Sequence, residues 1–198
     1  MYQSSFAGEP DWQRDEDALF EASIRVLKQF ATDNPDQIVS AFGFDSEPCY
    51  GYALIAIETP ATAFAVAADR ETRQIENRYR YFARADAWKR AKSYTSREAI
   101  DYSDSTGYFA YPNLETVQFS GWEVFANGDS YPEPDKATNP DYMEGHACLM
   151  FWRVSERLIA QGAFDALKLW TPFRIGFNFH DERFVTLRML NRPTAPGG

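Results

Sequence analysis

The sequence lacks the features that mark most catalytic and membrane proteins. It contains two cysteines and two histidines, and no apolar run near the about eighteen residues that a membrane-spanning helix needs. The glycine-rich phosphate loops, the GxSxG nucleophile motif, the HExxH zinc motif and the EF-hand pattern are all absent. The N-terminus also has no basic region followed by an apolar one, which is the pattern of a secretion signal. We therefore expect a cytoplasmic protein without a membrane partner.

The few cysteines and histidines do not suggest a metal site or a catalytic pair. Cys49 and Cys148 form no CxxC motif, which argues against a zinc knuckle, and a reducing cytosol disfavours a disulfide between them. Cys148 and His146 are two residues apart and would point in different directions on a helix. The consecutive residues 180–182 (His-Asp-Glu) rarely converge on one ion. We expect Cys148 in the core, no metal and no cofactor, and whether the two cysteines meet is left open.

The length and composition are typical of one soluble globular domain. The 198 residues are 44% hydrophobic and 25% charged, and a chain of this size buries roughly 70% of its unfolded surface without help from metals or disulfides. We expect a single domain over residues 1–198, with a loose N-terminal arm at 1–10 and a loose C-terminal tail at 193–198.

Hydrophobic periodicity predicts helices and strands that alternate irregularly along the chain. Helices are expected at 12–32, 60–76 and 142–160, with a short helix at 85–92 and a last one at 182–190 that Asp181 would cap. Strands are expected at 38–44, 50–57 and 173–179, with 79–82 as a further candidate.

The order of these elements favours an α+β fold. A turn at 45–48 separates the first two strands, so an antiparallel hairpin is expected, and both faces of 50–57 are apolar, which is typical of a central strand. Thr171-Pro172 would end the segment before 173–179. The expected architecture is a mainly antiparallel sheet of about four strands with helices packed on it.

Charge is distributed in blocks along the chain. The net charge is −9, yet residues 69–97 contain nine bases and four acids, whereas residues 98–147 contain ten acids and one base. The basic block, interleaved with aromatic residues, superficially resembles a nucleic-acid surface. The acidity of the whole molecule, with a pI of about 4.8, repels phosphate backbones instead. We expect internal ion pairs and no nucleic-acid partner, and whether 69–97 is a binding surface is left open.

The segment 101–141 is the best candidate for a partner-binding surface. It is rich in Gly, Pro, acids and aromatic residues and is expected to be mostly irregular, and long structured loops often carry function. Its acids would pair with bases on the partner and its aromatic rings would fill the partner's pockets. The expected binding residues are Asp101, Asp104, Tyr108, Tyr111, Trp122, Asp129, Glu133, Asp135 and Asp141.

Two other functions fit the same residues. A small glycosidase-like hydrolase would use two carboxylates across a cleft, with aromatic rings of 101–141 as sugar platforms. A structural or scaffolding protein would instead present a large apolar patch and self-associate. The absence of catalytic motifs favours a protein that is not an enzyme.

Several short stretches carry a resemblance to a known family. They are, in chain order, Asn34-Pro35-Asp36-Gln37, IVSAFGF, YGYALIAIET, RYFARADAWKRA and RIGFNFHDE. With the acidic N-terminal helix and the long helix near the C-terminus, this order resembles a family of small acidic bacterial cytosolic proteins known as a domain of unknown function. Some of its members resemble the SUKH-type immunity proteins that accompany polymorphic toxins.

The resemblance implies a function but no catalytic residues. An immunity protein binds its cognate toxin and covers the toxin's active site, and many such toxins are basic. An acidic, aromatic-rich surface would speed association with a basic toxin domain and would supply rigid anchors for it. The expectation is therefore a non-catalytic protein-binding module that neutralises a bacterial toxin.

Overall fold

The computed structural model describes residues 10–66, 105–123, 139–180 and 183–191. The predictions for the N-terminal arm, for 79–82, for 85–92 and for the C-terminal tail fall outside these residues. The elements are α1 (Trp12–Asp33), β1 (Ile38–Glu47), η1 (Pro48–Tyr50), β2 (Tyr52–Glu58), η3 (Thr106–Tyr108), β3 (Tyr111–Gln118), α5 (Asn139–Ala160), β4 (Lys168–Phe179) and β5 (Val185–Leu190).

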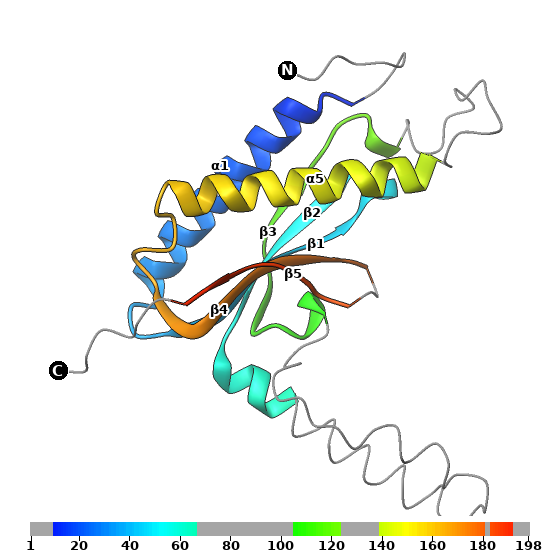
Figure 1. Ribbon diagram of the computed structural model, residues 1–198. Helices are drawn as coiled ribbons and strands as arrows, with labels where there is room; N and C mark the ends of the chain where they lie inside the picture. The colour runs from blue at the N-terminus through cyan, green and yellow to red at the C-terminus, as the bar shows by residue number, and fades with distance from the viewer. Residues whose placement is uncertain (1–9, 67–104, 124–138, 181–182, 192–198) are drawn as a thin grey trace, which may run out of the picture.

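The fold is α+β, as predicted, but the sheet is mixed and has five strands rather than four. The strand order is β3-β2-β1-β4-β5, so β2 is an inner strand as expected. The pairs β1–β2, β2–β3 and β4–β5 are antiparallel, whereas β1 and β4 run parallel. Helices α1 and α5 lie together on one face of the sheet and η3 lies on the opposite face (Figure 1).

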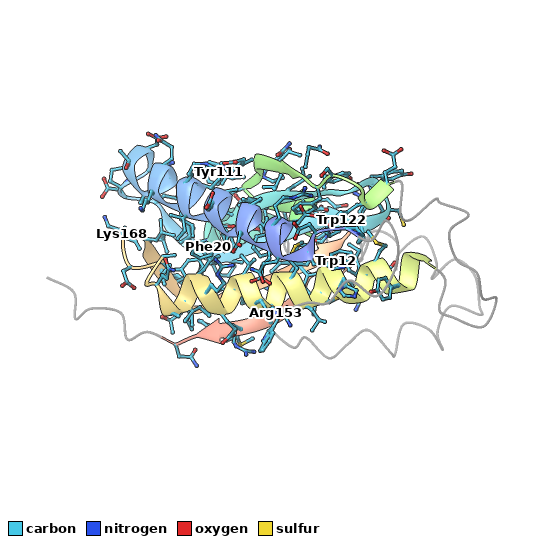
Figure 2. The ribbon with its side chains drawn as sticks, turned by 90° about the horizontal axis from the view of Figure 1, so that it is seen from above. Trp12, Phe20, Tyr111, Trp122, Arg153 and Lys168 are labelled. Atoms are coloured by element: carbon cyan, nitrogen blue, oxygen red, sulfur yellow. The ribbon has the colours of Figure 1, made fainter. Side chains whose placement is uncertain are left out.

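Helix α1 forms where the periodicity predicts it. Asp11 is its N-cap, and the Asp11 carboxylate accepts a 3.1 Å hydrogen bond from the backbone N–H of Arg14. Leu19, Val26 and Phe30 are buried on the side that faces the sheet and α5. Figure 2 shows α1 crossing above the sheet beside α5. Burial of the apolar stripe therefore holds α1 against the sheet, and only the polar side of the helix faces water.

Ion pairs join α1 to α5. Nη1 of Arg157 lies 3.1 Å from Glu16 Oε1 and 2.7 Å from Asp17 Oδ1, and its guanidinium lies 4.2 Å from the ring centroid of Phe20. Arg153 approaches the other oxygen of Glu16 at 3.8 Å. Acidic residues near the start of a helix interact favourably with the helix dipole. The acids near the start of α1 also pair with bases on the neighbouring helix α5.

The turn predicted at 45–48 lies later in the chain. β1 continues to Glu47, and the chain reverses through η1 and Gly51, whose φ of +66° suits glycine. The polar residues that suggest a turn are buried inside the strand instead, where Ser46 Oγ donates a 2.6 Å hydrogen bond to the carbonyl oxygen of Tyr52. Side-chain hydrogen bonds therefore allow polar residues to extend this strand.

The helix predicted at 182–190 is wrong, because residues Val185–Leu190 form strand β5. β5 pairs with β4 antiparallel, and the register shifts between Ile175 and Gly176. Because of this irregularity, Leu187 and Leu190 both pack against the core although they are three residues apart. A separation of three residues is also the spacing of one face of a helix. The ladder with β4 and the β-branched pair Val185-Thr186 favour the strand.

Two further strands extend beyond the sequence predictions. β4 begins at Lys168, so the cis peptide Thr171-Pro172 lies inside the strand instead of ending a segment before it. β3 lies within 101–141, which was expected to be mostly irregular, and pairs with β2. Both segments gain their extended form from long-range pairing, which local sequence patterns do not contain.

The remaining helices follow the predictions as far as they are described. α5 spans Asn139–Ala160, and Gly162, with a φ of +64°, follows its end. A helix begins at Pro60 and is described to Val66. Thr59 caps it, since its Oγ1 accepts a 3.3 Å hydrogen bond from the N–H of Thr62. In the part of the chain that the structure describes, no helix is long and apolar enough to cross a membrane.

Candidate functional site

The sheet face opposite α1 and α5 has a buried polar cluster near the C-terminal ends of β1 and β4. Asp45 of β1 and Asn178 of β4 are side by side in the parallel register, and both side chains are buried. Gly43 and Gly176, two residues earlier on each strand, are also side by side. The strands therefore present a matched pair of glycines and a matched pair of polar side chains to the same face.

The polar pair holds the start of η3. Thr106 is fully buried; its backbone N–H donates a 2.9 Å hydrogen bond to Asn178 Oδ1 and its hydroxyl donates a 2.7 Å hydrogen bond to Asp45 Oδ2. The Asn178 amide in turn donates to the carbonyl oxygen of Phe179 at 3.0 Å. Hydrogen bonds to a charged group contribute about 1.5–3 kcal/mol, so Thr106 is firmly fixed to the sheet.

The end of η3 is fixed independently. Glu58 at the end of β2 is fully buried, and its Oε1 accepts hydrogen bonds from the backbone N–H groups of Thr59 (2.8 Å) and Ala110 (3.1 Å). Phe109 is buried against Ala41, Ala56 and Phe184. The segment from Thr106 to Ala110 is thus held at both ends by buried groups.

Tyr108 is exposed at the middle of this fixed segment. Its side chain is 57% exposed, while its neighbour Phe109 is 4% exposed. The backbone N–H of Tyr108 donates to the carbonyl oxygen of Ser105 at 3.0 Å, and that of Phe109 donates to Thr106 at the same distance. An exposed tyrosine on an ordered turn can insert into a pocket of a partner at little entropic cost.

His180 lies next to the polar cluster at the end of β4. Its Nδ1 is 3.9 Å from Asp45 Oδ1, which has no hydrogen-bond partner among the described residues. His180 is more than half exposed, so this is an edge of the cluster that water reaches. Within residues 10–66, 105–123, 139–180 and 183–191, no group of three or more His, Cys, Asp or Glu side chains could hold a metal ion.

The other predicted aromatic anchors lie in different surroundings. Tyr111 begins β3, and its ring packs edge-on against Phe30 of α1, with the centroids 4.9 Å apart. Tyr111 is only partly exposed, so Tyr108 is the described aromatic residue of the predicted set that presents most of its ring to solvent.

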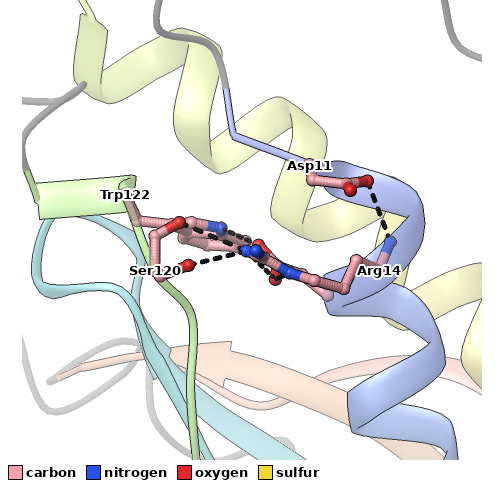
Figure 3. A network of polar contacts seen from close by, with 5 residues as sticks. Asp11, Arg14, Ser120 and Trp122 are labelled. Atoms are coloured by element: carbon pink, nitrogen blue, oxygen red, sulfur yellow. Dashed lines mark hydrogen bonds and ion pairs between the residues drawn. The ribbon is translucent and has the colours of Figure 1, made fainter.

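Trp122 was expected to be exposed, and this is wrong. Its side chain is 0% exposed and packs against Phe119, with ring centroids 4.6 Å apart, and against Trp12, at 5.1 Å. Its indole N–H donates a 2.7 Å hydrogen bond to the buried Asp15 carboxylate (Figure 3). A large ring with one satisfied donor is stable in a core, and Trp122 closes the junction of α1 with the end of β3.

The carboxylate of Asp15, which Trp122 contacts, has a raised pKa. Burial raises the pKa of Asp15 above its usual value near 3.8, although hydrogen bonds from Arg14 and Trp122 act in the opposite direction. Nη2 of Arg14 lies 2.9 Å from Asp15 Oδ1 and donates a 2.8 Å hydrogen bond to Ser120 Oγ. Figure 3 shows these groups as one network between α1 and the turn after β3.

The acidic residues of the predicted surface are largely outside the described residues. Asp141 belongs to α5, but its side chain is not among those described. The others outside the described ranges are Asp101, Asp104, Asp129, Glu133 and Asp135. Among the described residues neither cysteine forms a disulfide; both are half-buried, and Cys148 packs against the core, as expected.

Sequence reasoning did not identify the buried polar cluster, although a signal exists. The tripeptides Gly43-Phe44-Asp45 and Gly176-Phe177-Asn178 have the same pattern, and the parallel register aligns them residue by residue. Two strands that share a tripeptide pattern are candidates for neighbours in a sheet, and paired in register they present equivalent residues on the same face. Thr106 has no comparable signal.

Comparison with known proteins finds no family model that matches the chain, and no curated protein or solved structure with significant similarity to it.

Proposed function

We propose that this chain is a non-catalytic protein-binding module that neutralises a cognate bacterial toxin by binding it directly, with Tyr108 as the central anchor of the contact. The observation that carries the proposal is the contrast at η3, where an exposed tyrosine stands on a segment fixed by the buried residues Thr106 and Phe109. Binding energy at protein interfaces is concentrated in such rigid aromatic side chains.

The charge of the chain supports a basic partner. The net charge is −9, and the block 98–147, which contains η3, has ten acids and one base. A negative field around an aromatic anchor raises the rate of association with a positively charged domain and has less effect on the dissociation rate. The proposal therefore assigns affinity to the tyrosine and association rate to the acids of the block 98–147.

The test uses the neighbouring gene. The gene for this chain should lie beside one that encodes a large secreted protein with a variable C-terminal domain. That C-terminal domain is expressed in bacteria with and without this chain, and growth and complex formation are measured. We expect growth arrest by the domain alone, rescue by co-expression, and an equimolar complex by light scattering.

Matched variants then locate the contact. We expect Tyr108→Ala to weaken the complex at least about thirty-fold, the effect of a central hot spot. Tyr50→Ala, which removes a 65% exposed tyrosine from η1, should leave affinity within about twofold of the wild type. Reversing Asp101 and Asp104 to Lys should slow association and flatten its dependence on salt. Continued toxicity on co-expression, or equal effects of the two tyrosine variants, would refute the proposal.

A further inference from the structure

The polar cluster beneath η3 leaves one buried acceptor unused. Asp45 is 6% exposed, and its Oδ2 accepts the hydroxyl of Thr106 at 2.7 Å, whereas its Oδ1 has no hydrogen-bond partner among the described residues. A buried carboxylate oxygen without a donor is costly, because nothing replaces the water that it loses on burial. With η3 closed over Asp45, one further donor at Oδ1 would therefore stabilise the cluster.

The imidazole of His180 lies beside this oxygen. Its Nδ1 is 3.9 Å from Asp45 Oδ1, about 1 Å longer than a charge-assisted hydrogen bond between nitrogen and oxygen. The backbone of His180 is fixed, because its N–H donates a 3.0 Å hydrogen bond to the carbonyl oxygen of Ser46. The side chain, in contrast, is 59% exposed. The ring can therefore turn toward Asp45 without displacing β4.

The charge of the imidazole determines how well it can serve Asp45. A neutral imidazole has one N–H, which only one of its two tautomers places on Nδ1, whereas the protonated ring donates from both nitrogens and has the charge opposite to a carboxylate. Imidazole groups change charge between about pH 5 and pH 8, while carboxylates ordinarily titrate below this range and tyrosine and arginine above it. A change of pH in this range therefore acts through His180 at this end of the sheet.

The charges around His180 are mainly acidic. Glu47 follows two residues after Asp45 on β1, so its side chain lies on the same face of the sheet. Arg183, in the connection from β4 to β5, is exposed and opposes protonation of a neighbouring ring. Asp181 and Glu182 of this connection lie outside the described residues. The other titratable groups described at this end are Cys49 and Tyr50 of η1, Tyr52 of β2 and Tyr108 of η3.

We propose that protonation of His180 draws its ring onto Asp45 Oδ1 and holds η3 closed, so that the Tyr108 turn is locked more firmly in mild acid than in mild base. Opening of η3 would expose Asp45 to water, which hydrates Oδ1 without help from His180, so the added donor favours the closed state. The closed state then binds the proton more tightly than the open one. Its stabilisation is present at low pH and is lost as pH rises through the titration of the closed state.

Hydrogen exchange of the free, full-length chain tests this lock. The reporters are the N–H groups of Tyr108 and Phe109, which donate to the carbonyl oxygens of Ser105 and Thr106. Exchange is followed by NMR at about pH 5.5 and about pH 8, and each rate is compared with the intrinsic rate at that pH, which gives the local opening equilibrium. We expect about fivefold greater protection at the lower pH, a modest effect because the ring is exposed.

An amide at the other end of the sheet is the internal control. The N–H of Leu167 donates to the carbonyl oxygen of Phe164 at 3.2 Å, in the connection between α5 and β4. Its protection should stay within about twofold between the two pH values, since no contact joins it to His180. An equal change at Leu167 and at Tyr108 would show a general effect of pH on stability and would overturn the proposal.

Three variants identify the two groups that form the lock. His180→Gln changes an exposed side chain, should fold as the wild type does, and should abolish the pH dependence of protection at Tyr108 and Phe109. Asp45→Asn should abolish it as well. Glu47→Gln is the matched control, because it removes the neighbouring carboxylate of the same strand face, and it should keep the fivefold change.

Two further results would overturn the lock: protection at Tyr108 that does not change with pH in the wild type, or a pH dependence that survives His180→Gln or is abolished by Glu47→Gln. The effect of the lock on partner binding through Tyr108 rests on the proposed function, but these measurements use no partner. Failure of the lock would therefore leave toxin neutralisation standing, and failure to rescue growth would leave the lock standing.

Discussion

The indole N–H of Trp122 donates a 2.7 Å hydrogen bond to Oδ2 of Asp15, although 107 residues separate the two in the chain. Both side chains are buried, and Arg14 occupies the other oxygen of the carboxylate. The residue that composition suggests as a surface anchor is therefore a structural link between α1 and the turn after β3. Loss of this link should affect stability first and partner binding only through folding.

Replacement of Trp122 should destabilise the protein far more than replacement of an exposed tryptophan. Trp122→Phe keeps an aromatic ring but removes the donor to a buried carboxylate, so we expect the free energy of unfolding to fall by about 1–3 kcal/mol. Trp152→Phe changes a 40% exposed ring on α5, and should change it by no more than about 0.5 kcal/mol. Urea unfolding followed by circular dichroism measures both, and similar losses would contradict the role of the Trp122 N–H.

The raised pKa of Asp15 should make the folded state less stable as pH rises through the acid range. Between the usual pKa near 3.8 and the higher pKa in the folded state, the folded protein binds more protons at Asp15 than the unfolded chain does. Deprotonation in this window therefore favours unfolding. Asp15→Asn keeps an oxygen that can accept from Trp122 and removes the titration, so its stability relative to the wild type should increase as pH rises through the window.

Asp36 is a control because its pKa shift has the opposite sign to that of Asp15. A hydrogen bond and the charge of Lys168 lower the pKa of Asp36, whose exposed carboxylate lies 2.6 Å from Lys168 Nζ. Its contribution is present above the usual pKa and disappears as pH falls through the lowered value. Asp36→Asn should thus lose stability relative to the wild type as pH rises, by a small amount because the pair is exposed. Parallel pH profiles for the two variants would argue against burial as the cause at Asp15.

Local sequence patterns located the long helices α1 and α5 and three of the five strands, but they placed a helix where β5 forms and did not give the full pairing of the sheet. The apolar stripes of 12–32 and 142–160 predict α1 and α5 closely because a helix satisfies its backbone hydrogen bonds within itself. The parallel pairing of β1 with β4 and the strand character of β3 and β5 depend on partners far away in the sequence. Periodicity cannot supply those partners, and residues Val185–Leu190, within the helix predicted at 182–190, form a strand beside β4 instead.

Of the expected binding residues, Tyr108 is exposed, as a surface residue must be, whereas the buried residues that fix its turn were not anticipated from the sequence. Tyr108 is exposed within the segment that composition favours for binding, whereas Trp122 is buried through a hydrogen bond that composition does not reveal. Asp45 and Thr106, which fix the turn beneath Tyr108, carry no catalytic or binding motif. Their importance depends on burial, and burial of a polar residue is a property of the assembled sheet.

The adjacent glycines Gly43 and Gly176 should tolerate alanine to different degrees. A Cβ at Gly43 would lie 2.6 Å from the Phe184 ring, whereas one at Gly176 would overlap the backbone carbonyl oxygen of Val185 as well as that ring. A side chain can move more easily than backbone, so Gly176→Ala should be the more destabilising. Adding Phe184→Leu should restore stability to Gly43→Ala and fail to restore Gly176→Ala.

Gly145 provides the matched glycine control for this comparison. It lies in α5, and an added Cβ there would meet no atom within 4 Å apart from the adjoining residues and backbone of its own helix. Alanine should therefore stabilise the helix there by about 0.5–1 kcal/mol. Thermal unfolding of the single and double variants checks the set, and a Gly176→Ala protein as stable as the wild type would show that the ladder at this point can shift to accept a side chain.

The hydroxyl of Thr106 should matter more than its methyl group. Thr106→Val retains the shape of the side chain but removes the 2.7 Å hydrogen bond to Asp45 Oδ2, while Asp45 Oδ1 already has no hydrogen-bond partner among the described residues. A buried carboxylate left without a donor costs about 1–3 kcal/mol or more, so we expect a loss of stability of that size and faster hydrogen exchange at the N–H groups of Tyr108 and Phe109.

Two further variants separate the hydrogen bond from the packing around it. Thr106→Ser keeps the donor and should cost less than Thr106→Val, because only a methyl group is lost. Asp45→Asn in the Thr106→Val background should recover part of the loss, since a neutral amide is less costly to bury than a carboxylate. If Thr106→Val instead matched Thr106→Ser in both unfolding free energy and exchange rates, the Asp45 contact would not be what fixes the Tyr108 turn, and the support for Tyr108 as a rigid anchor would have to come from Asn178, Glu58 and Phe109.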